Sequence, residues 1–330
     1  MYNTNQFNPT ENFPPVFYEK KAIRRTANRI GFAVLAMLAI MAGWSFVYFK
    51  ITTLLGITTE KALALTEEPM FIQILQVVIS LFMSFLPFVV LLKSMYLKAA
   101  KIIPFGNPKK GISAGFILGG VGYCLFASSA ASAAGEIFNN FGISFPQTET
   151  DLPTGIFGFL MAVITTAVLP ALVEEFAIRG VVLGLLRHFG DGFAIISSSI
   201  VFGFMHASFV QIPFAFLVGL LFSLVTVKTN SIWPAVVIHA INNFLSVVLS
   251  YLYLYFAEDI VNTVYLIIMC VSFIVSMIAI VLLLKRDGEV FKTVPANTAA
   301  AEKEKIAWFI TAPTVIISCL AALLIAYFFR

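Results

Sequence analysis

The sequence is poor in charge. Only 12% of its 330 residues are Asp, Glu, Lys or Arg, whereas about 25% of a soluble globular chain is charged. Hydrophobic residues make up 60% of the chain, and phenylalanine alone occurs 34 times. This composition excludes an ordinary soluble domain. It predicts an all-α polytopic membrane protein whose helices form one bundle.

Cysteine is also scarce. Cys124, Cys270 and Cys319 are scattered through apolar segments, without the spacing of a metal site or a disulfide framework. We therefore expect them to be small buried hydrophobic residues. No cleavable signal peptide is expected either, because the first apolar run is long and follows a polar tail. Internal repeats and low-complexity tracts are not evident.

Nine apolar stretches approach or exceed the length that crosses a bilayer. They cover about 30–49, 70–92, 111–138, 156–188, 193–209, 213–227, 232–255, 260–284 and 306–329. We expect a bundle of about 8–9 transmembrane helices. Its predicted parts are a polar tail with a basic collar at 1–29, three helices at 30–155, a core at 156–255, and C-terminal helices at 256–330 with a charged connector at 285–305.

Basic residues alternate with the predicted spans. The collar, the loop at 93–110, Arg187, Lys228 and the connector fall on one side of the membrane. The loops on the opposite side carry Glu149, Asp151, Glu258 and Asp259. By the positive-inside rule, the N-terminus is predicted to be cytoplasmic. Within the third span, small residues at spacing four from Gly111 to Gly135 predict a helix-packing seam.

Two adjacent carboxylates and an arginine interrupt the apolar segment at 171–180. Ionisable residues inside membrane helices are costly and indicate a functional site by default. Glu175 and Arg179 are four residues apart on one helix face, so they can pair. Glu174 is offset by about 100° round the helix, which leaves it free for chemistry. Pro170, one turn earlier, predicts a kink.

Three further polar side chains lie in apolar helices downstream. Phe202 and His206 share one helix face, and His239 and Asn243 share another. At ~1.5 Å per residue, Glu174 and these three polar residues lie roughly 12–20 Å from the basic ends of their helices. We therefore expect residues from three helices to converge on one polar cavity inside the membrane.

The expected cluster contains the parts of a peptide-hydrolysing site. Glu174 and His206 form a pair that can activate and orient water, and donors on His239 and Asn243 can stabilise a tetrahedral oxyanion. Alternatively, Glu174, His206 and His239 could ligate zinc. The His-Glu-x-x-His segment of many zinc peptidases is absent. The residues leave open whether the site has no cofactor or uses zinc.

Glu174-Glu175-x-x-x-Arg179, Phe202-x-x-x-His206 and His239-x-x-x-Asn243 follow one another on successive helices. In this order they resemble the three motifs of the CPBP intramembrane protease family, which includes type II CAAX prenyl endopeptidases and bacteriocin-processing or self-immunity proteins. The resemblance covers about 156–254.

The family resemblance implies an intramembrane endopeptidase in which Glu174 and His206 activate water and His239 and Asn243 form the oxyanion site. Glu175 and Arg179 would support the site or grip the substrate, with Phe202 packing beside it. The resemblance admits both metalloprotease and metal-free glutamate mechanisms. It implies a peptide or lipidated protein substrate in the bilayer, either prenylated CAAX-type or a peptide precursor, and no nucleic acid. Family breadth favours a prokaryotic cell membrane.

A non-enzymatic interpretation uses the same side chains. Buried carboxylates and histidines also serve as proton relays in transporters, and an immunity-type binding protein would need no catalysis. Taken singly, the acidic pair could mark a helix end at which Glu175 forms a salt bridge with Arg179. Asn243 could simply form a hydrogen bond between two helices. Transporters often show repeat symmetry or paired broken helices, and neither is obvious in this sequence.

Overall fold

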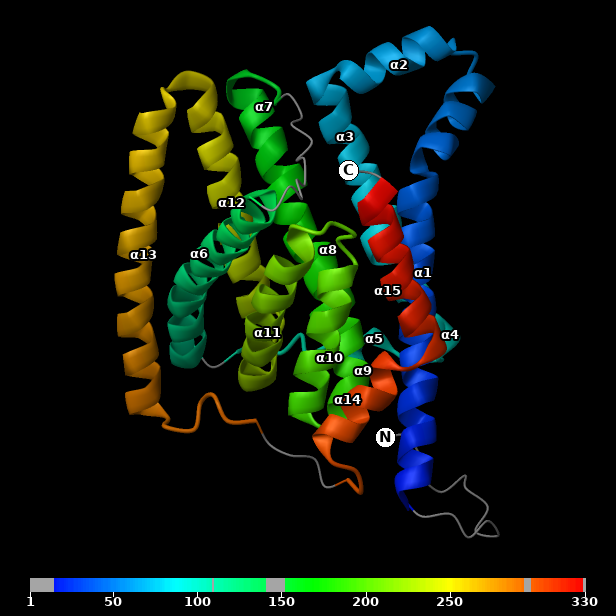
Figure 1. Cartoon of the computed structure of the whole chain (residues 1–330), viewed down its shortest axis with the longest axis vertical. Coiled ribbons are helices and arrows are strands. Elements are labelled where there is room, and N and C mark those ends of the chain that lie inside the picture. The colour runs from blue at the N-terminus through cyan, green and yellow to red at the C-terminus, as the bar shows by residue number, and fades with distance from the viewer. Residues whose placement is uncertain (1–14, 109, 141–151, 294–297, 329–330) are drawn as a thin grey trace.

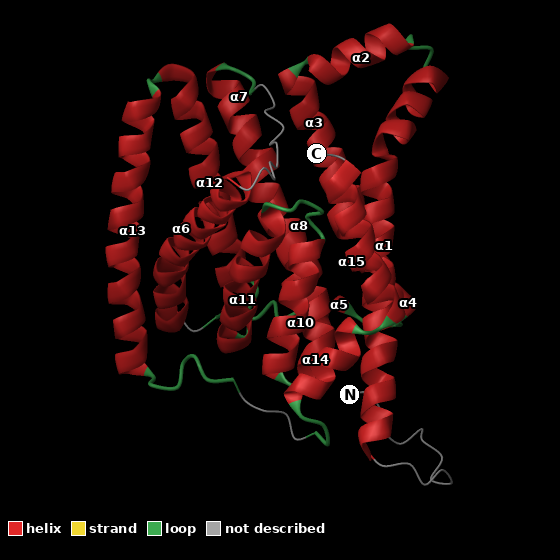
Figure 2. Ribbon diagram, viewed as in Figure 1, coloured by secondary structure: helices red, strands yellow, loops and turns green. Residues whose placement is uncertain are grey.

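The computed structural model describes residues 15–108, 110–140, 152–293 and 298–328, and every regular element in these ranges is a helix (Figure 2). The α-helices are α1 (Pro15–Leu54), α2 (Thr59–Glu67), α3 (Pro69–Ser80), α4 (Leu86–Ser94), α5 (Ala99–Ile102), α6 (Lys110–Asn140), α7 (Gly155–Ala162), α8 (Leu169–Glu175), α9 (Leu183–Leu186), α10 (Asp191–Phe204), α11 (Gln211–Thr229), α12 (Trp233–Tyr255), α13 (Glu258–Arg286), α14 (Glu302–Ile310) and α15 (Pro313–Phe328). The π-helices are η2 (Leu81–Phe85), η3 (Val163–Val168) and η4 (Phe176–Val182), and η5 (Arg187–Phe189) is a 3₁₀ turn. The predicted all-α fold is confirmed.

The number of candidate membrane spans agrees with the lower end of the predicted 8–9. Within the described residues, seven are long and apolar enough to cross a membrane, or eight if α14 and α15, bent by 63°, count as one span. The predicted span at 193–209 is α10, which has only 14 residues and is about 21 Å long. Such a helix falls short of the ~30 Å hydrocarbon layer.

The α10–α11 pair instead forms a hairpin inside the bundle. Its turn ends well below the upper ends of α7, α12 and α13 (Figure 1). His206 lies in this turn, directly after α10. The hairpin therefore delivers a polar side chain to the interior of the bundle rather than to its far surface.

One end of the bundle, here called the basic end, holds the start of α1, the η5 turn, the end of α11 and the connector after α13 (Figure 1). Helix α1 begins at Pro15, so the basic collar is part of this helix. The buried Lys305 of α14 donates to the Phe189 carbonyl over 2.7 Å and lies 3.7 Å from Glu19 of α1. This contact joins α1 and α14 to η5, the end of the segment that carries the acidic pair. Residues 1–14, Glu149 and Asp151 lie outside the described residues.

Small residues on α6 let it approach α13 closely. A Cβ added at Gly115 would lie 2.6 Å from Leu283, and one at Gly119 would lie 3.6 Å from Ile280. At Gly122 the added atom would lie 2.7 Å from the Ser272 carbonyl oxygen. The predicted packing seam is present at Gly115 and Gly119, with α13 as its partner, but it does not extend to Gly135, where an added Cβ would have no neighbouring atom within 4 Å.

We expect Gly122→Ala to destabilise the protein by about 1–3 kcal/mol, because the new methyl group meets backbone that cannot yield. The matched control is Gly135→Ala on the same helix, where no neighbouring atom lies within 4 Å of the added carbon. Thermal unfolding of the purified protein in detergent should show a lower Tm for the first variant only. Equal Tm values would contradict the close seam.

Candidate active site

The acidic pair lies on α8, between two π-helical stretches, η3 and η4. Pro170 has no N–H to donate to the carbonyl of Thr166, four residues earlier. The side-chain amide of Asn243 takes that place, since its Nδ2 donates to the Thr166 oxygen over 3.1 Å. The hydroxyl of the preceding Thr165 donates to Gln73 of α3. The distortion expected at Pro170 thus takes the form of a widened helix that is tied to its neighbours on both sides.

Glu175 and Arg179 form the expected ion pair. Arg179 Nη1 lies 2.9 Å from Glu175 Oε1, and both side chains are fully buried. His239 Nδ1 also lies 2.9 Å from the same oxygen. Because a carboxylate can only accept, His239 donates from Nδ1, and only Nε2 is left for a group in the cavity. The sequence predicted one partner for Glu175, and the structure gives it two.

Two phenylalanines enclose the Arg179 guanidinium. Its Cζ lies 4.1 Å from the ring centre of Phe202 and 5.0 Å from that of Phe222. The His239 ring stacks on Phe222 with centroids 5.4 Å apart, and Arg179 Nη2 donates to the Gly219 carbonyl over 3.4 Å. Ring faces stabilise a buried cation. Phe202 therefore has a definite supporting contact, as the sequence suggested.

Glu174 points away from this ion pair and faces His206. The distance from Glu174 Oε2 to His206 Nε2 is 3.9 Å, and the two side chains are 18% and 23% exposed. His206 Nδ1 donates to the Phe202 carbonyl over 2.8 Å, which fixes the proton on Nδ1 and directs the Nε2 lone pair toward Glu174. The gap is too long for a direct hydrogen bond and suits one water bridging the two groups.

Both halves of the cluster border one cavity of about 280 Å³. Its polar lining residues are Thr166, Glu174, His206, Gln211, His239, Asn242, Asn243 and Ser246. The opposite wall is apolar and includes Phe214, Ala215 and Val218 of α11. Asn243 Oδ1 accepts from Asn242 over 3.1 Å, which leaves one hydrogen of the Asn243 amide without a described partner. The four residues that the sequence singled out for catalysis thus line one space.

Sequence reasoning did not find Phe222, Gly219 or Thr166. The first two lie in α11, whose segment 212–222 is wholly apolar and gives no sign that it borders a polar site. Thr166 could have been found, because it stands four residues before a proline and must lose its helical hydrogen bond. Contacts made by a backbone carbonyl or a ring face leave little trace in a residue pattern.

The described residues contain no group of three His, Cys, Asp or Glu side chains arranged to hold a metal ion. The Nδ1 atoms of His206 and His239 are engaged by the Phe202 carbonyl and by Glu175. Glu174, His206 and His239 line the same cavity without forming the ligand set that zinc requires. The side chains as placed do not fit zinc, and the mechanism below uses none.

The fold and the cavity define a class: a multi-pass, all-helical membrane protein with an acid and two imidazoles facing an internal polar space. A family model described as Type II CAAX prenyl endopeptidase Rce1-like matches residues 155–245, which are 91 of the 330. The match begins with α7 and ends within α12, so it includes all four predicted catalytic residues. The resemblance is confirmed over this segment and implies a peptidase. No curated protein and no solved structure matches the chain.

We expect Glu175→Gln to lower the free energy of unfolding by about 3 kcal/mol, because it leaves the Arg179 charge buried without its counter-ion. The control is Glu289→Gln, which removes the same charge from a pair with Lys292 whose side chains are 75% and 71% exposed. That change should leave Tm unaltered. A Glu175→Gln protein with normal stability and no activity would reverse the roles of the two glutamates.

Proposed function

We propose that this protein is an intramembrane endopeptidase that hydrolyses a peptide bond of a membrane-associated substrate. The observation that carries the proposal is the separation of roles between two adjacent glutamates. Glu175 pairs with Arg179 and His239. Glu174 lies at the cavity, with its Oε2 atom 3.9 Å from His206 Nε2. A partly buried acid whose only ion-pair contact among the described residues is an imidazole, in a space that admits water, is suited to general base catalysis.

In the proposed reaction, a water molecule bridges Glu174 Oε2 and His206 Nε2. Glu174 takes one proton from the water, and the oxygen attacks the carbonyl carbon of the scissile peptide bond. The C–N bond then breaks, and the proton held by Glu174 passes to the leaving amine. The products are a carboxylic acid and an amine, so no oxidant or other co-reactant is needed.

The oxyanion of the tetrahedral intermediate requires donors that are already in place. His239 would donate from Nε2, and its ring is held in place because Nδ1 donates to Glu175. Asn243 supplies its remaining amide hydrogen, with its orientation fixed by Thr166 and Asn242. Both donors are therefore held by second contacts before substrate arrives, which is the condition for efficient electrostatic catalysis.

The match to a CAAX prenyl endopeptidase-like family supports a prenylated CAAX-type C-terminus as the substrate. An unmodified peptide precursor is the second class, which the motif resemblance in the sequence implies. The cavity combines one apolar wall from α11 with polar groups on α8 and α12. An extended peptide could place an apolar side chain on the first wall and its backbone on the second. Purified full-length protein tested against prenylated and unprenylated versions of one quenched peptide would separate the two classes.

Glu174→Ala and His206→Ala should each lower the rate of peptide cleavage at least ~100-fold, since general base catalysis typically contributes that much or more. Cleavage of the quenched peptides is the measurement, and Tm of each variant shows whether it still folds. The control Glu60→Ala removes an exposed carboxylate on α2 and should cleave like the native protein. Retained turnover in either site variant would overturn the assignment.

The same assay run after dialysis against a chelator tests the metal-free form of the mechanism. We expect unchanged turnover, because the described side chains form no three-ligand set. Loss of activity that returns on adding zinc would show that Glu174 and the histidines rearrange around a metal. No cleavage of any peptide by the native protein would favour the non-enzymatic interpretation.

We also propose that the basic end faces the cytoplasm, on the strength of the basic residues gathered there. The test uses a chain with its native cysteines replaced. A membrane-impermeant maleimide added to intact cells should label Glu60→Cys, which lies at the opposite end in α2, and should not label Glu289→Cys in the connector (Figure 1). The reverse labelling pattern would invert the orientation.

A further inference from the structure

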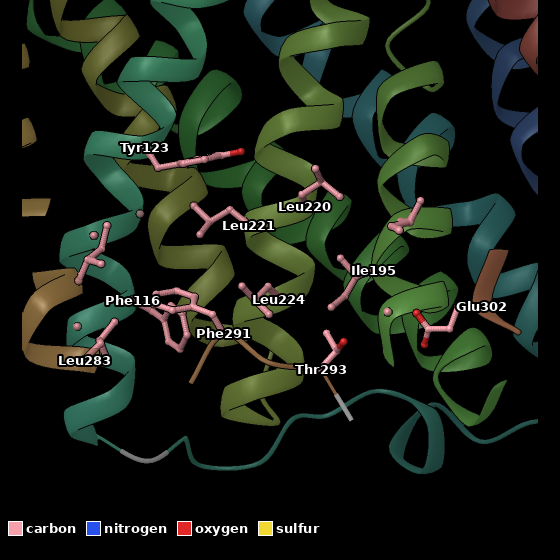
Figure 3. A pocket seen from close by; sticks show the side chains of 16 residues that line it. Phe116, Tyr123, Ile195, Leu220, Leu221, Leu224, Leu283, Phe291, Thr293 and Glu302 are labelled. Atoms are coloured by element: carbon pink, nitrogen blue, oxygen red, sulfur yellow. The ribbon is translucent and has the colours of Figure 1, made fainter. Parts of the chain in front are cut away.

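A second cavity lies on the other side of α11 from the candidate active site. It has a volume of about 500 Å³ and is bordered by α6, α10, α11 and α13, with the connector at the basic end (Figure 3). Leu220, Leu221 and Leu224 of α11 face it, whereas Ala215 and Val218 face the active-site cavity. The two sets lie on opposite faces of the helix, so α11 is the wall between two separate spaces.

The polarity of this second cavity is confined to one end. Phe116, Ile195, Leu283 and the leucines of α11 make most of its lining apolar. At the end away from the connector, the Tyr123 hydroxyl is already used, since it donates to the Leu217 carbonyl over 3.1 Å. At the basic end lie Thr293 and Glu302, and the carboxylate of Glu302 points toward the cavity (Figure 3). The space therefore fits an amphiphile rather than a uniformly apolar molecule.

Glu302 is the unusual member of this lining. Its Oε1 atom is buried and has no hydrogen-bond partner, and none of the ion pairs in the described part of the chain includes it. Lys305, one turn further along α14, is engaged by Phe189 and Thr298. A partly buried carboxylate without a partner is costly. None of the ion pairs in the described residues reaches Glu302, so a cationic group in the cavity would stabilise it.

Two helix N-termini lie beside this carboxylate. Glu302 is the first residue of α14, and its Oε2 lies so close to Gly192, the second residue of α10, that a Cβ there would be 2.2 Å away. The first turn of a helix favours negative charge. The position therefore suits an acidic side chain, and a cationic group in the cavity would be its partner.

The connector closes the cavity at this end. Phe291 packs edge-on against Phe116 with ring centroids 6.0 Å apart. Lys228 of α11 donates to the carbonyls of Glu289 and Lys292 on either side of Phe291. The cavity is of the size and composition typical of ligand sites, which are mostly apolar with few placed polar groups. Its polar end is also the end where lipid headgroups of a surrounding bilayer would lie.

We propose that this cavity binds an amine-headed membrane lipid. The ammonium group donates to the Glu302 carboxylate and to Thr293 Oγ1, and the acyl chain lies along Phe116, Leu220, Leu221 and Leu224. The site is distinct from the active site, and it is built partly from the connector and α14, which lie outside the segment matched by the peptidase family. The lipid holds the connector and α14 against the core.

The test compares phosphatidylethanolamine with phosphatidylglycerol of identical acyl chains, added to delipidated full-length protein in detergent. Native mass spectrometry gives the affinity, and the rise in Tm gives an independent measure. The native protein should prefer phosphatidylethanolamine. Glu302→Gln should weaken its binding by about tenfold, the loss of one charge-assisted hydrogen bond, and should leave phosphatidylglycerol unchanged. The control Glu289→Gln should keep the preference.

Leu221→Trp provides a second route, because it fills the cavity without touching the carboxylate. It should reduce phosphatidylethanolamine binding even if Glu302→Gln fails to fold. Equal affinity of the native protein for the two lipids would overturn the proposal, as would full binding by a folded Glu302→Gln or Leu221→Trp protein. Peptide cleavage plays no part in these readouts, so their failure would leave the peptidase proposal untouched.

Discussion

The structure of the site depends on one buried carboxylate. Glu175 is fully enclosed, and its Oε1 atom accepts from both Arg179 and His239. A charge in such surroundings is tolerated only when it is paired with good geometry, so Glu175 fixes the relative position of α8 and α12. Arg179 extends the same constraint to α10 and α11 through Phe202, Phe222 and Gly219. Four helices thus meet around one ionic contact.

This arrangement explains why Glu174 can remain apart. The two glutamates are neighbours in sequence and face different directions round one helix. Because Glu175 pairs with Arg179 and His239, Glu174 is left at the cavity, where it faces His206. Proline chemistry contributes to the same result. Pro170 frees the Thr166 carbonyl, and the amide that occupies it, Asn243, becomes oriented toward the site. The helix hydrogen bond lost at Pro170 and the contact between α12 and η3 thus favour the same arrangement.

Helix α11 borders both cavities, and its sequence does not indicate this. One face completes the aromatic enclosure of Arg179 and the apolar wall of the active-site cavity, and the other lines a larger apolar space capped by the connector. The two cavities share this wall, yet their polar groups differ in kind: an acid with imidazoles in one, a single unpaired carboxylate in the other. The proposed peptidase site and the proposed lipid site thus lie on two sides of one short hairpin.

The sequence alone determined the all-helical membrane fold, since charge is scarce and apolar stretches recur at bilayer length. It also determined that Glu175 pairs with Arg179, because i and i+4 share a helix face whatever the rest of the chain does. Hydropathy could not show that α10 stops short of the far side, because apolar length says nothing about where a turn lies in depth. The stretch at 193–209 was therefore counted as a span, although α10 is too short to cross the bilayer.

Only the tertiary structure decided which nitrogen meets which oxygen. Nothing in the spacing of His239 indicates that it binds Glu175 rather than facing Glu174, since that depends on how α12 is rotated against α8. Phe222 and the carbonyl of Gly219 are invisible to motif reasoning for the same reason: a ring face or a backbone oxygen acquires its role from the neighbour that packs on it. The sequence fixes what each helix can offer, and the packing of helices decides what it meets.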